Sequence, residues 1–157
     1  MNVFVLHTDP TLCAQMHADK HVVKMIVETA QLLCTVHHLK GSNRDYMYRK
    51  THVNHPCSKW ARESVQNYKW LCRLGLELCR EYTYRYGKIH KTQRVLERLA
   101  LDIPNLPDSE LTAWALAMPI ECKVENDAVE SYRRYYVMEK QRLAKWKNRN
   151  VPTWFSN

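Results

Sequence analysis

The segment from His17 to Leu33, HADKHVVKMIVETAQLL, places ionisable side chains in one line along an otherwise apolar helix pattern. Spacings of four, three, four and three residues put this line on one face of a helix. A helix that is apolar around most of its circumference belongs inside a fold, so its polar line must face water, a cleft or a polar network. The segment therefore predicts a central helix with either a solvated edge or a site. The residues on the line are His17, His21, Lys24, Glu28 and Gln31.

The rest of the chain favours helices over sheets, because only three of the 157 residues are glycine and 45% are hydrophobic. We expect one all-α domain over residues 1–157, a compact helical bundle with two long central helices and an extended aromatic C-terminal tail. The short apolar run at residues 2–7 fits a strand or an extended arm. The expected helices run from Pro10 or Thr11 to about His38, from Cys57 to about Tyr86, within residues 89–102, from a cap at Asp108 or Ser109, and from about Ala128 until Pro152 breaks the tail. Residues 118–129 are expected to be extended.

Cap residues support these limits. Thr8 or Asp9 suits the start of the first helix, and Asn54 or His55 before Pro56 suits the start of the second. Gly87 is a stop signal for the second helix.

The composition also restricts the cellular setting. No apolar run approaches the roughly 20 residues that cross a bilayer, and the amino end lacks the basic start of a secretion signal. We expect a cytoplasmic protein without membrane contact. The six cysteines form no Cys-x-x-Cys pair, so we expect reduced thiols that pack as small hydrophobic groups.

The net charge of +8 suggests a nucleic-acid partner, although a merely soluble basic protein is the alternative. The start of the second helix could receive a phosphate. The aromatic residues of the tail could stack on bases or wedge into a duplex, unless Trp154 instead anchors the tail to the core. The candidate nucleic-acid-binding residues are Asn54, His55, Lys59, Arg62, Lys147, Arg149, Trp154 and Phe155.

The polar line has three interpretations. A Lys24–Glu28 pair on a solvated edge would contribute only about 0.3–0.5 kcal/mol. A carboxylate, an amine and imidazoles within reach of each other could instead serve as acid, base and nucleophile. A metal site built on His17 and His21 is the third, but no His-Glu-x-x-His pattern occurs, and we expect no metal.

ADKHVVKMIVETAQLL resembles the central helix of the pyrimidine-dimer DNA glycosylases of the phage endonuclease V type and their wider bacterial relatives. The shared pattern is Asp19, His21, an apolar pair and Glu28. The segment that begins NHPCSKWARESVQNYKWL is similar to the second helix of the family, and RNVPTWF is similar to its tail. The resemblance covers residues 1–90 and the last ten.

This resemblance implies an all-α enzyme that needs no cofactor and breaks glycosidic bonds in DNA. It implies that an N-terminal amine attacks the sugar, that Glu28 stabilises charge and handles protons, and that His21 is its polar neighbour. An imine forms and can then eliminate, which breaks the strand. It also implies a phage-type protein, which would act in the cytoplasm of the host cell.

The sequence departs from the family pattern beside this glutamate and at the amino end. Val27 and Gln31 stand where the family has arginines, and Asn2 stands where the family typically has the threonine that supplies the amine. The amine of Met1 is therefore a candidate nucleophile, with Lys24 and then Lys20 as alternatives. An α-amine reacts more readily near neutral pH, because reference pKa values are roughly 7.7–8.0 for α-amines and about 10.4 for lysine.

The predicted function is a DNA glycosylase, with or without lyase activity on abasic sites, that acts on a damaged or modified base. The candidate catalytic residues are Glu28, Lys24, His21 and Met1. A non-catalytic DNA-binding module and an enzyme that processes free nucleotides remain open. The base and the oligomeric state are also open.

Overall fold

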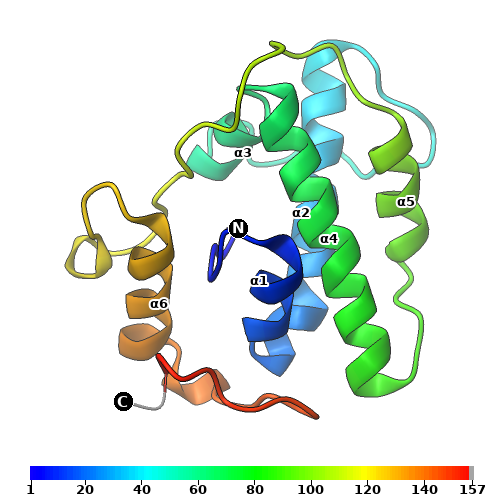
Figure 1. The fold of residues 1–157 in the computed structure, drawn as a ribbon. Helices are drawn as coiled ribbons and strands as arrows, with labels where there is room; N and C mark the ends of the chain where they lie inside the picture. Colours follow the sequence, from blue (N-terminus) through cyan, green and yellow to red (C-terminus); the bar gives the residue numbers. More distant parts are fainter. Residues whose placement is uncertain (156–157) are drawn as a thin grey trace.

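The computed structural model describes residues 1–155, which form helices joined by irregular segments (Figure 1). No β-strand occurs among these residues, so the all-α prediction is confirmed. No helix within residues 1–155 is long and apolar enough to cross a bilayer. The helices are α1 (Pro10–Met16), α2 (Asp19–Lys40), α3 (Pro56–Ala61), α4 (Val65–Tyr86), α5 (Gln93–Leu101) and α6 (Ala128–Glu139), with short 3₁₀ turns η1 (Ile120–Cys122) and η2 (Gln141–Leu143).

The first predicted long helix is two helices, and the prediction that it runs unbroken from Pro10 or Thr11 is wrong. Asp9 caps α1 as expected, but His17 and Ala18 adopt extended backbone conformations between α1 and α2. The ring of His17 donates from Nδ1 to the carbonyl oxygen of Cys13 at 2.7 Å. This bond closes the end of α1, and α2 then starts in a new direction at Asp19.

The second predicted long helix is also interrupted, at residues 62–64 between α3 and α4. Ser64 is the N-cap of α4, since its hydroxyl accepts from the backbone N–H of Asn67 at 3.1 Å. The amide of Asn67 donates to the carbonyl of Trp60 at 2.8 Å and so satisfies the end of α3. The predicted cap at His55 and the stop at Gly87, which has φ of 67°, are confirmed.

Three predictions for the last third of the chain need correction. No helix starts at Asp108 or Ser109, because residues 103–118 are irregular. The segment expected to be extended contains η1. The last helix ends at Glu139, well before Pro152, and the chain then turns back toward α1, where the indole of Trp146 donates to the carbonyl of Met16 at 2.8 Å.

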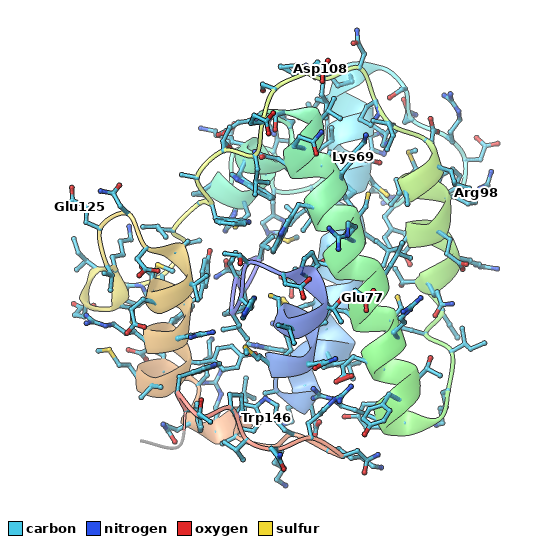
Figure 2. All side chains as sticks on the ribbon, in the orientation of Figure 1. Lys69, Glu77, Arg98, Asp108, Glu125 and Trp146 are labelled. Carbon is cyan, nitrogen blue, oxygen red and sulfur yellow. The ribbon has the colours of Figure 1, made fainter. Side chains whose placement is uncertain are left out.

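Helices α2 and α4 cross at the centre of the molecule, and α5 packs beside α4 (Figure 1). Gly75 permits this close approach, since a Cβ there would lie 2.9 Å from Cδ2 of Leu96 and 3.0 Å from Cγ2 of Thr29. The amino-terminal segment, residues 1–6, is extended and lies between α6 and α1, where side chains fill the space between the ribbons (Figure 2). Residues 2–6 are buried, and all six cysteines are buried as free thiols, as predicted.

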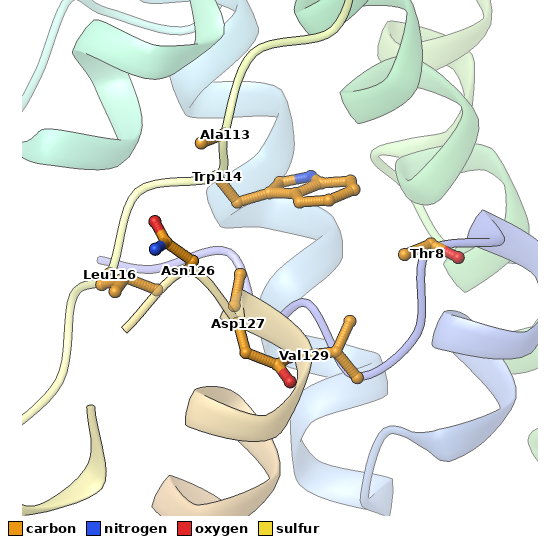
Figure 3. Close-up of a pocket in the computed structure, with 8 residues that line it drawn as sticks. Thr8, Ala113, Trp114, Leu116, Asn126, Asp127 and Val129 are labelled. Atoms are coloured by element: carbon orange, nitrogen blue, oxygen red, sulfur yellow. The ribbon is translucent and has the colours of Figure 1, made fainter. Parts of the chain in front are cut away.

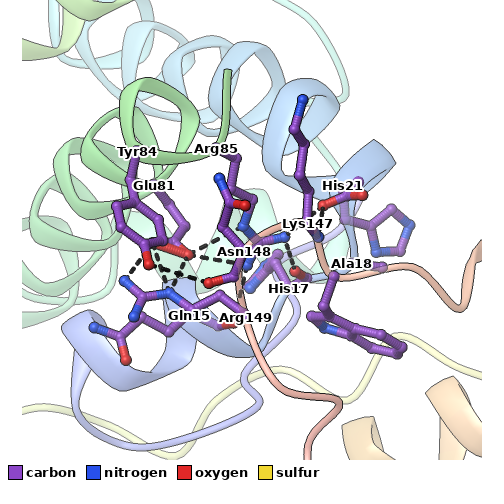
Figure 4. A network of polar contacts seen from close by, with 12 residues as sticks. Gln15, His17, Ala18, His21, Glu81, Tyr84, Arg85, Lys147, Asn148 and Arg149 are labelled. Atoms are coloured by element: carbon purple, nitrogen blue, oxygen red, sulfur yellow. Dashed lines mark hydrogen bonds and ion pairs between the residues drawn. The ribbon is translucent and has the colours of Figure 1, made fainter. Parts of the chain in front are cut away.

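A buried ion network joins α4 to the junction of α1 and α2 and to the C-terminal segment (Figure 4). The guanidinium of Arg85, which is 2% exposed, donates to Glu81 at 3.0 Å and to Asp19 at 3.0 Å. It also donates to the carbonyls of His17 at 2.8 Å and Gln15 at 2.9 Å. On the other side, Arg149 donates to Glu81 at 2.9 Å. This network holds the bend between α1 and α2 in place.

Two buried histidines are expected to make stability depend on pH. Burial lowers the pKa of His17 to about 4 and that of His21 to about 3, from the ordinary value of 6.5 for histidine. In the unfolded chain both rings therefore take up protons below about pH 6.5, while the folded rings stay neutral. The contribution of the two neutral rings to the free energy of unfolding is fully present above pH 6.5. It falls as the pH drops, by about 2 kcal/mol per histidine between pH 7.5 and pH 5. Urea unfolding followed by circular dichroism at these two pH values measures the loss.

The matched variants for this test are His21→Gln and His52→Gln. We expect the first to make the pH dependence shallower by about 2 kcal/mol, because Gln takes up no proton. The second removes an exposed ring and serves as the control for loss of a histidine. Identical slopes in wild type and His21→Gln would contradict the assignment.

Candidate active site

The amino-terminal segment is held in the interior by the side chain of Asn2. Its amide nitrogen donates to the carbonyl of Ala117 at 2.8 Å, and its oxygen accepts from the hydroxyl of Tyr132 at 3.0 Å and from the backbone N–H of Val3 at 2.8 Å. Asn2 is 8% exposed. These bonds fix the position of the backbone immediately after Met1 and therefore the position of the Met1 amine.

The Met1 amine lies against the carboxylate of Glu28 on α2. Its nitrogen is 3.2 Å from Oε1 of Glu28, and both side chains are largely shielded, at 3% and 10% exposure. The other oxygen, Oε2, is buried and makes no hydrogen bond among the described residues. It lies 3.9 Å from Nζ of Lys24, whose side chain is 69% exposed. Glu28 therefore faces one enclosed amine and one solvent-exposed amine.

A surface groove of about 460 Å³ gives access to this pair. Its polar lining residues come from α2, from the loop after it and from the segment before α5. The apolar part of the wall consists of Val23 and Val27. The remaining residues that line it are Met1, Lys24, Glu28, Gln31, His52 and His90. Three of the four predicted catalytic residues, Met1, Lys24 and Glu28, thus meet in one open groove.

The fourth, His21, does not line this groove. It lies two turns before Glu28 on the same face of α2, but its ring is 4% exposed and stacks on Phe4 with ring centroids 4.3 Å apart. Its Nδ1 is 2.6 Å from the hydroxyl of Tyr136 on α6. Burial lowers its pKa to about 3, so His21 is a neutral core residue rather than the polar neighbour of Glu28.

The predicted phosphate site at the start of α3 is partly used for structure. His55 accepts from the backbone N–H of Cys57 at 3.0 Å as the helix cap, and burial together with the charge of the Met1 amine lowers its pKa. Arg62 donates to the carbonyl of Val53 at 2.9 Å and to Ser58 at 3.1 Å, which holds the loop before α3. Asn54 and Lys59 are exposed and remain free to contact a ligand.

The aromatic tail is packed against the protein, which corrects the prediction that it stacks on bases. Phe155 is 8% exposed and contacts Trp146 with ring centroids 4.9 Å apart. Trp154 lies against Tyr136 at 5.8 Å. The alternative that Trp154 anchors the tail to the core is the one observed.

The two predicted basic contacts before the tail are also engaged within the protein. Arg149 pairs with Glu81 in the buried ion network, as described above. The backbone N–H of Lys147 donates to Asp19 at 2.8 Å, while its ammonium lies 5.4 Å from the centre of the Tyr86 ring. Neither residue lines the groove around Glu28.

Residues that sequence reasoning missed reach the groove through the tertiary fold. His90 lies 62 residues after Glu28 and enters the groove only because the segment before α5 packs against α2. His52, in the loop after α2, lines the same groove. Among residues 1–155 no cluster of three or more His, Cys, Asp or Glu side chains is placed to hold a metal ion.

A separate depression of about 380 Å³ lies between the segment around Trp114 and the start of α6 (Figure 3). Its one carboxylate, Asp127, already accepts from the backbone N–H of Glu130 at 3.0 Å as the cap of α6. This depression lacks the pairing of an amine with a carboxylate that distinguishes the groove at Met1 and Glu28.

One comparison with known proteins found a match. Residues 1–94 match the sequence model of the family described as pyrimidine dimer DNA glycosylase. No match was found among curated proteins or among solved structures. The matched part covers more than half of the chain and includes every residue that lines the groove, whereas α6 and the tail lie outside it. The chain therefore belongs to the pyrimidine dimer DNA glycosylase family, a family of DNA-acting enzymes.

Proposed function

We propose that the protein is a DNA glycosylase that uses the α-amine of Met1 as nucleophile and Glu28 as proton carrier. The single observation that carries this proposal is the 3.2 Å distance between the amine nitrogen and Oε1 of Glu28, at the base of an open groove. The family's description as a DNA glycosylase supports the reaction class. Asn2 supports the choice of the Met1 amine, because the hydrogen bonds of its buried side chain fix the backbone next to that amine.

The proposed reaction starts when the ammonium of Met1 gives a proton to Glu28. The freed lone pair attacks C1′ of the target deoxynucleotide, and the glycosidic bond to the base breaks. The base leaves with the bonding electrons and receives a proton through Glu28. Oε2 of Glu28, which has no hydrogen-bond partner among residues 1–155, suits a group that must exchange protons with a substrate.

Ring opening then produces an imine. The C1′–O4′ bond breaks, a second bond forms between C1′ and the Met1 nitrogen, and O4′ takes one of the two protons on that nitrogen, which leaves a protonated imine. Lyase activity would follow if a proton-accepting group of the protein removes a proton from C2′ and the C3′–O bond then breaks. This step releases the phosphate and cuts the strand. Glu28 is the proposed acceptor of the C2′ proton. Hydrolysis of the imine restores the amine.

Lys24 is the competing nucleophile. Its Nζ is 3.9 Å from Oε2 of Glu28, but the side chain is 69% exposed and remains solvated. A mobile amine must lose more conformational freedom before it attacks than one held by the backbone. This difference favours Met1.

The groove also bears on the substrate. Val23 and Val27 offer an apolar wall for a base or sugar, and Gln31 offers an amide that can bond to a base edge. The family description suggests pyrimidine dimers as the first lesion to test. The open form of the groove favours a DNA strand over a free nucleotide, which would be expected to occupy an enclosed pocket.

Borohydride trapping identifies the nucleophile. The protein is incubated with sodium borohydride and a duplex that carries either a natural abasic site or a cyclobutane pyrimidine dimer. We expect a covalent adduct, because reduction converts the imine to a stable amine. Trypsin and mass spectrometry then locate it: a Met1 adduct lies in peptide 1–20, whereas an adduct on Lys24 blocks cleavage there and lies in peptide 21–40.

The control is Lys24→Gln, which should form the adduct as wild type does. An adduct in peptide 21–40 would assign the reaction to Lys24. No adduct with any substrate of a broad panel would overturn the imine mechanism. DNA affinity without base release would instead indicate a non-catalytic binding module.

A further inference from the structure

A second groove, of about 490 Å³, runs along α5 beside the loop that follows α2. Its lining combines basic and aromatic side chains. The residues are Tyr46, Tyr48, Lys91, Arg94, Val95 and Arg98. Figure 2 shows Arg98 at the outer edge of α5. Neither the charge pattern of the whole chain nor the family pattern had pointed to this surface.

The walls of this groove are held in place before any ligand binds. The hydroxyl groups of Tyr48 and Thr92 are 2.7 Å apart, which ties the loop to the start of α5. The ring of His38 bonds to the carbonyl of Tyr48 at 2.9 Å. The guanidinium of Arg98 lies 4.0 Å from the centre of the Tyr46 ring, a cation–π contact that orients its donors.

The cations of the groove are not neutralised within the protein. Lys91, Arg94 and Arg98 are exposed, and none of them forms an ion pair within residues 1–155. Arg94 and Arg98 are four residues apart on α5, a spacing at which like charges repel. Glu97 on the same helix is exposed and forms an ion pair with neither arginine. This arrangement leaves a row of donors for an anionic partner.

A depression of about 430 Å³, lined by residues 89–91, 93, 94 and 97, lies between this groove and the candidate active site. It shares His90 with the groove at Glu28, and it shares Lys91 and Arg94 with the groove on α5. Arg94 and Arg98 are separated by roughly 6 Å along the axis of α5, which is about the rise of two base pairs of DNA.

We propose that the groove on α5 binds the phosphate backbone of the DNA that flanks the target nucleotide, with Lys91, Arg94 and Arg98 as the phosphate contacts. This inference rests on the proposed function, because it takes the groove at Met1 and Glu28 as the place of the reacting sugar. Planar guanidinium groups bind phosphate oxygens through two parallel hydrogen bonds. Tyr48 borders the same groove and offers an aromatic face to the strand.

The test compares two double variants that remove the same charge. Arg94→Gln with Arg98→Gln alters the groove on α5. Lys69→Gln with Arg73→Gln alters another exposed basic pair with the same spacing, on α4. Fluorescence anisotropy measures affinity for a duplex with a tetrahydrofuran abasic analogue, which cannot form an imine, over a range of salt concentrations.

We expect the variant on α5 to reduce the slope of log affinity against log salt by about 2 and to weaken binding roughly 50-fold at 0.1 M salt. The variant on α4 should keep the slope and stay within about threefold of wild type. Equal losses in both variants, unchanged binding in the variant on α5, or no affinity in wild type would each overturn the inference.

The two proposals fail in different ways. If wild type traps no adduct, but the variant on α5 loses salt-dependent affinity and the variant on α4 does not, the proposed binding surface is supported and the proposed reaction is contradicted. If wild type traps the adduct at Met1 and the variant on α5 binds as wild type does, the reaction stands and the surface fails.

Discussion

Replacing Glu28 by Gln is expected to lower the single-turnover rate of base release by about 10²–10⁴-fold, the usual contribution of a positioned acid–base group. Gln has nearly the same shape but cannot take the proton from the Met1 amine 3.2 Å away or return it to the departing base. Gln keeps an amide oxygen that can accept from the Met1 amine, although the ion pair itself is lost. Rates on pyrimidine-dimer and abasic duplexes measure the effect.

The matched control is Lys24→Gln, one turn earlier on α2. Its side chain is exposed and lies 3.9 Å from Glu28, so we expect a change of less than about tenfold if Met1 is the nucleophile. Thermal unfolding of both variants checks that they are folded. Full activity of Glu28→Gln would show that proton transfer does not pass through this carboxylate.

Replacing Arg85 by Met is expected to lower the free energy of unfolding by about 3–5 kcal/mol, the usual result of removing one partner from a buried ion pair. Glu81, at 3% exposure, would keep only Arg149 as an ionic partner, and the carbonyls of His17 and Gln15 would lose their donors. Met has a similar volume, so the loss reports charge and hydrogen bonding rather than a cavity. Urea denaturation at pH 7.5 measures it.

Arg80→Met on the same helix is the control for this prediction. The Arg80 side chain is 82% exposed, and its nitrogen lies 3.9 Å from Glu77, so we expect a change within about 0.5 kcal/mol. A loss below about 1 kcal/mol in Arg85→Met would indicate that the network contributes little net stability, as some buried ion pairs do.

The helix ends that sequence reasoning identified have local causes. Asp9 and His55 accept bonds from backbone groups two residues later, and Gly87 adopts a left-handed conformation. Each signal depends only on neighbouring residues and can be recognised without a fold. The interruptions at His17 and at residues 62–64 were missed, although Ser64 is a good capping residue. Apolar spacing continues across both breaks, and bonds from Asn67 and Arg85 hold the altered path.

The polar line on α2 shows the same division within the site. Helical periodicity correctly places His21, Lys24 and Glu28 on one face. It cannot say what covers each end of that face. Phe4 and Tyr136 bury His21, whereas Met1 and the segment containing His90 leave Glu28 at the base of a groove. One helical stripe therefore contains both a core histidine and a candidate catalytic carboxylate.

By itself the sequence determined the helical class, several helix caps, the family pattern around Glu28 and the shared face of Lys24 and Glu28, because these depend on composition and on short regular spacings. The tertiary structure alone decided that the amine of Met1 meets Glu28, that the aromatic tail packs inward and that the basic side chains of residues 91–98 line a groove with Tyr46 and Tyr48. Those contacts join residues far apart in the chain. They form only when burial of the apolar surface selects one packing of the helices, which local spacing does not specify.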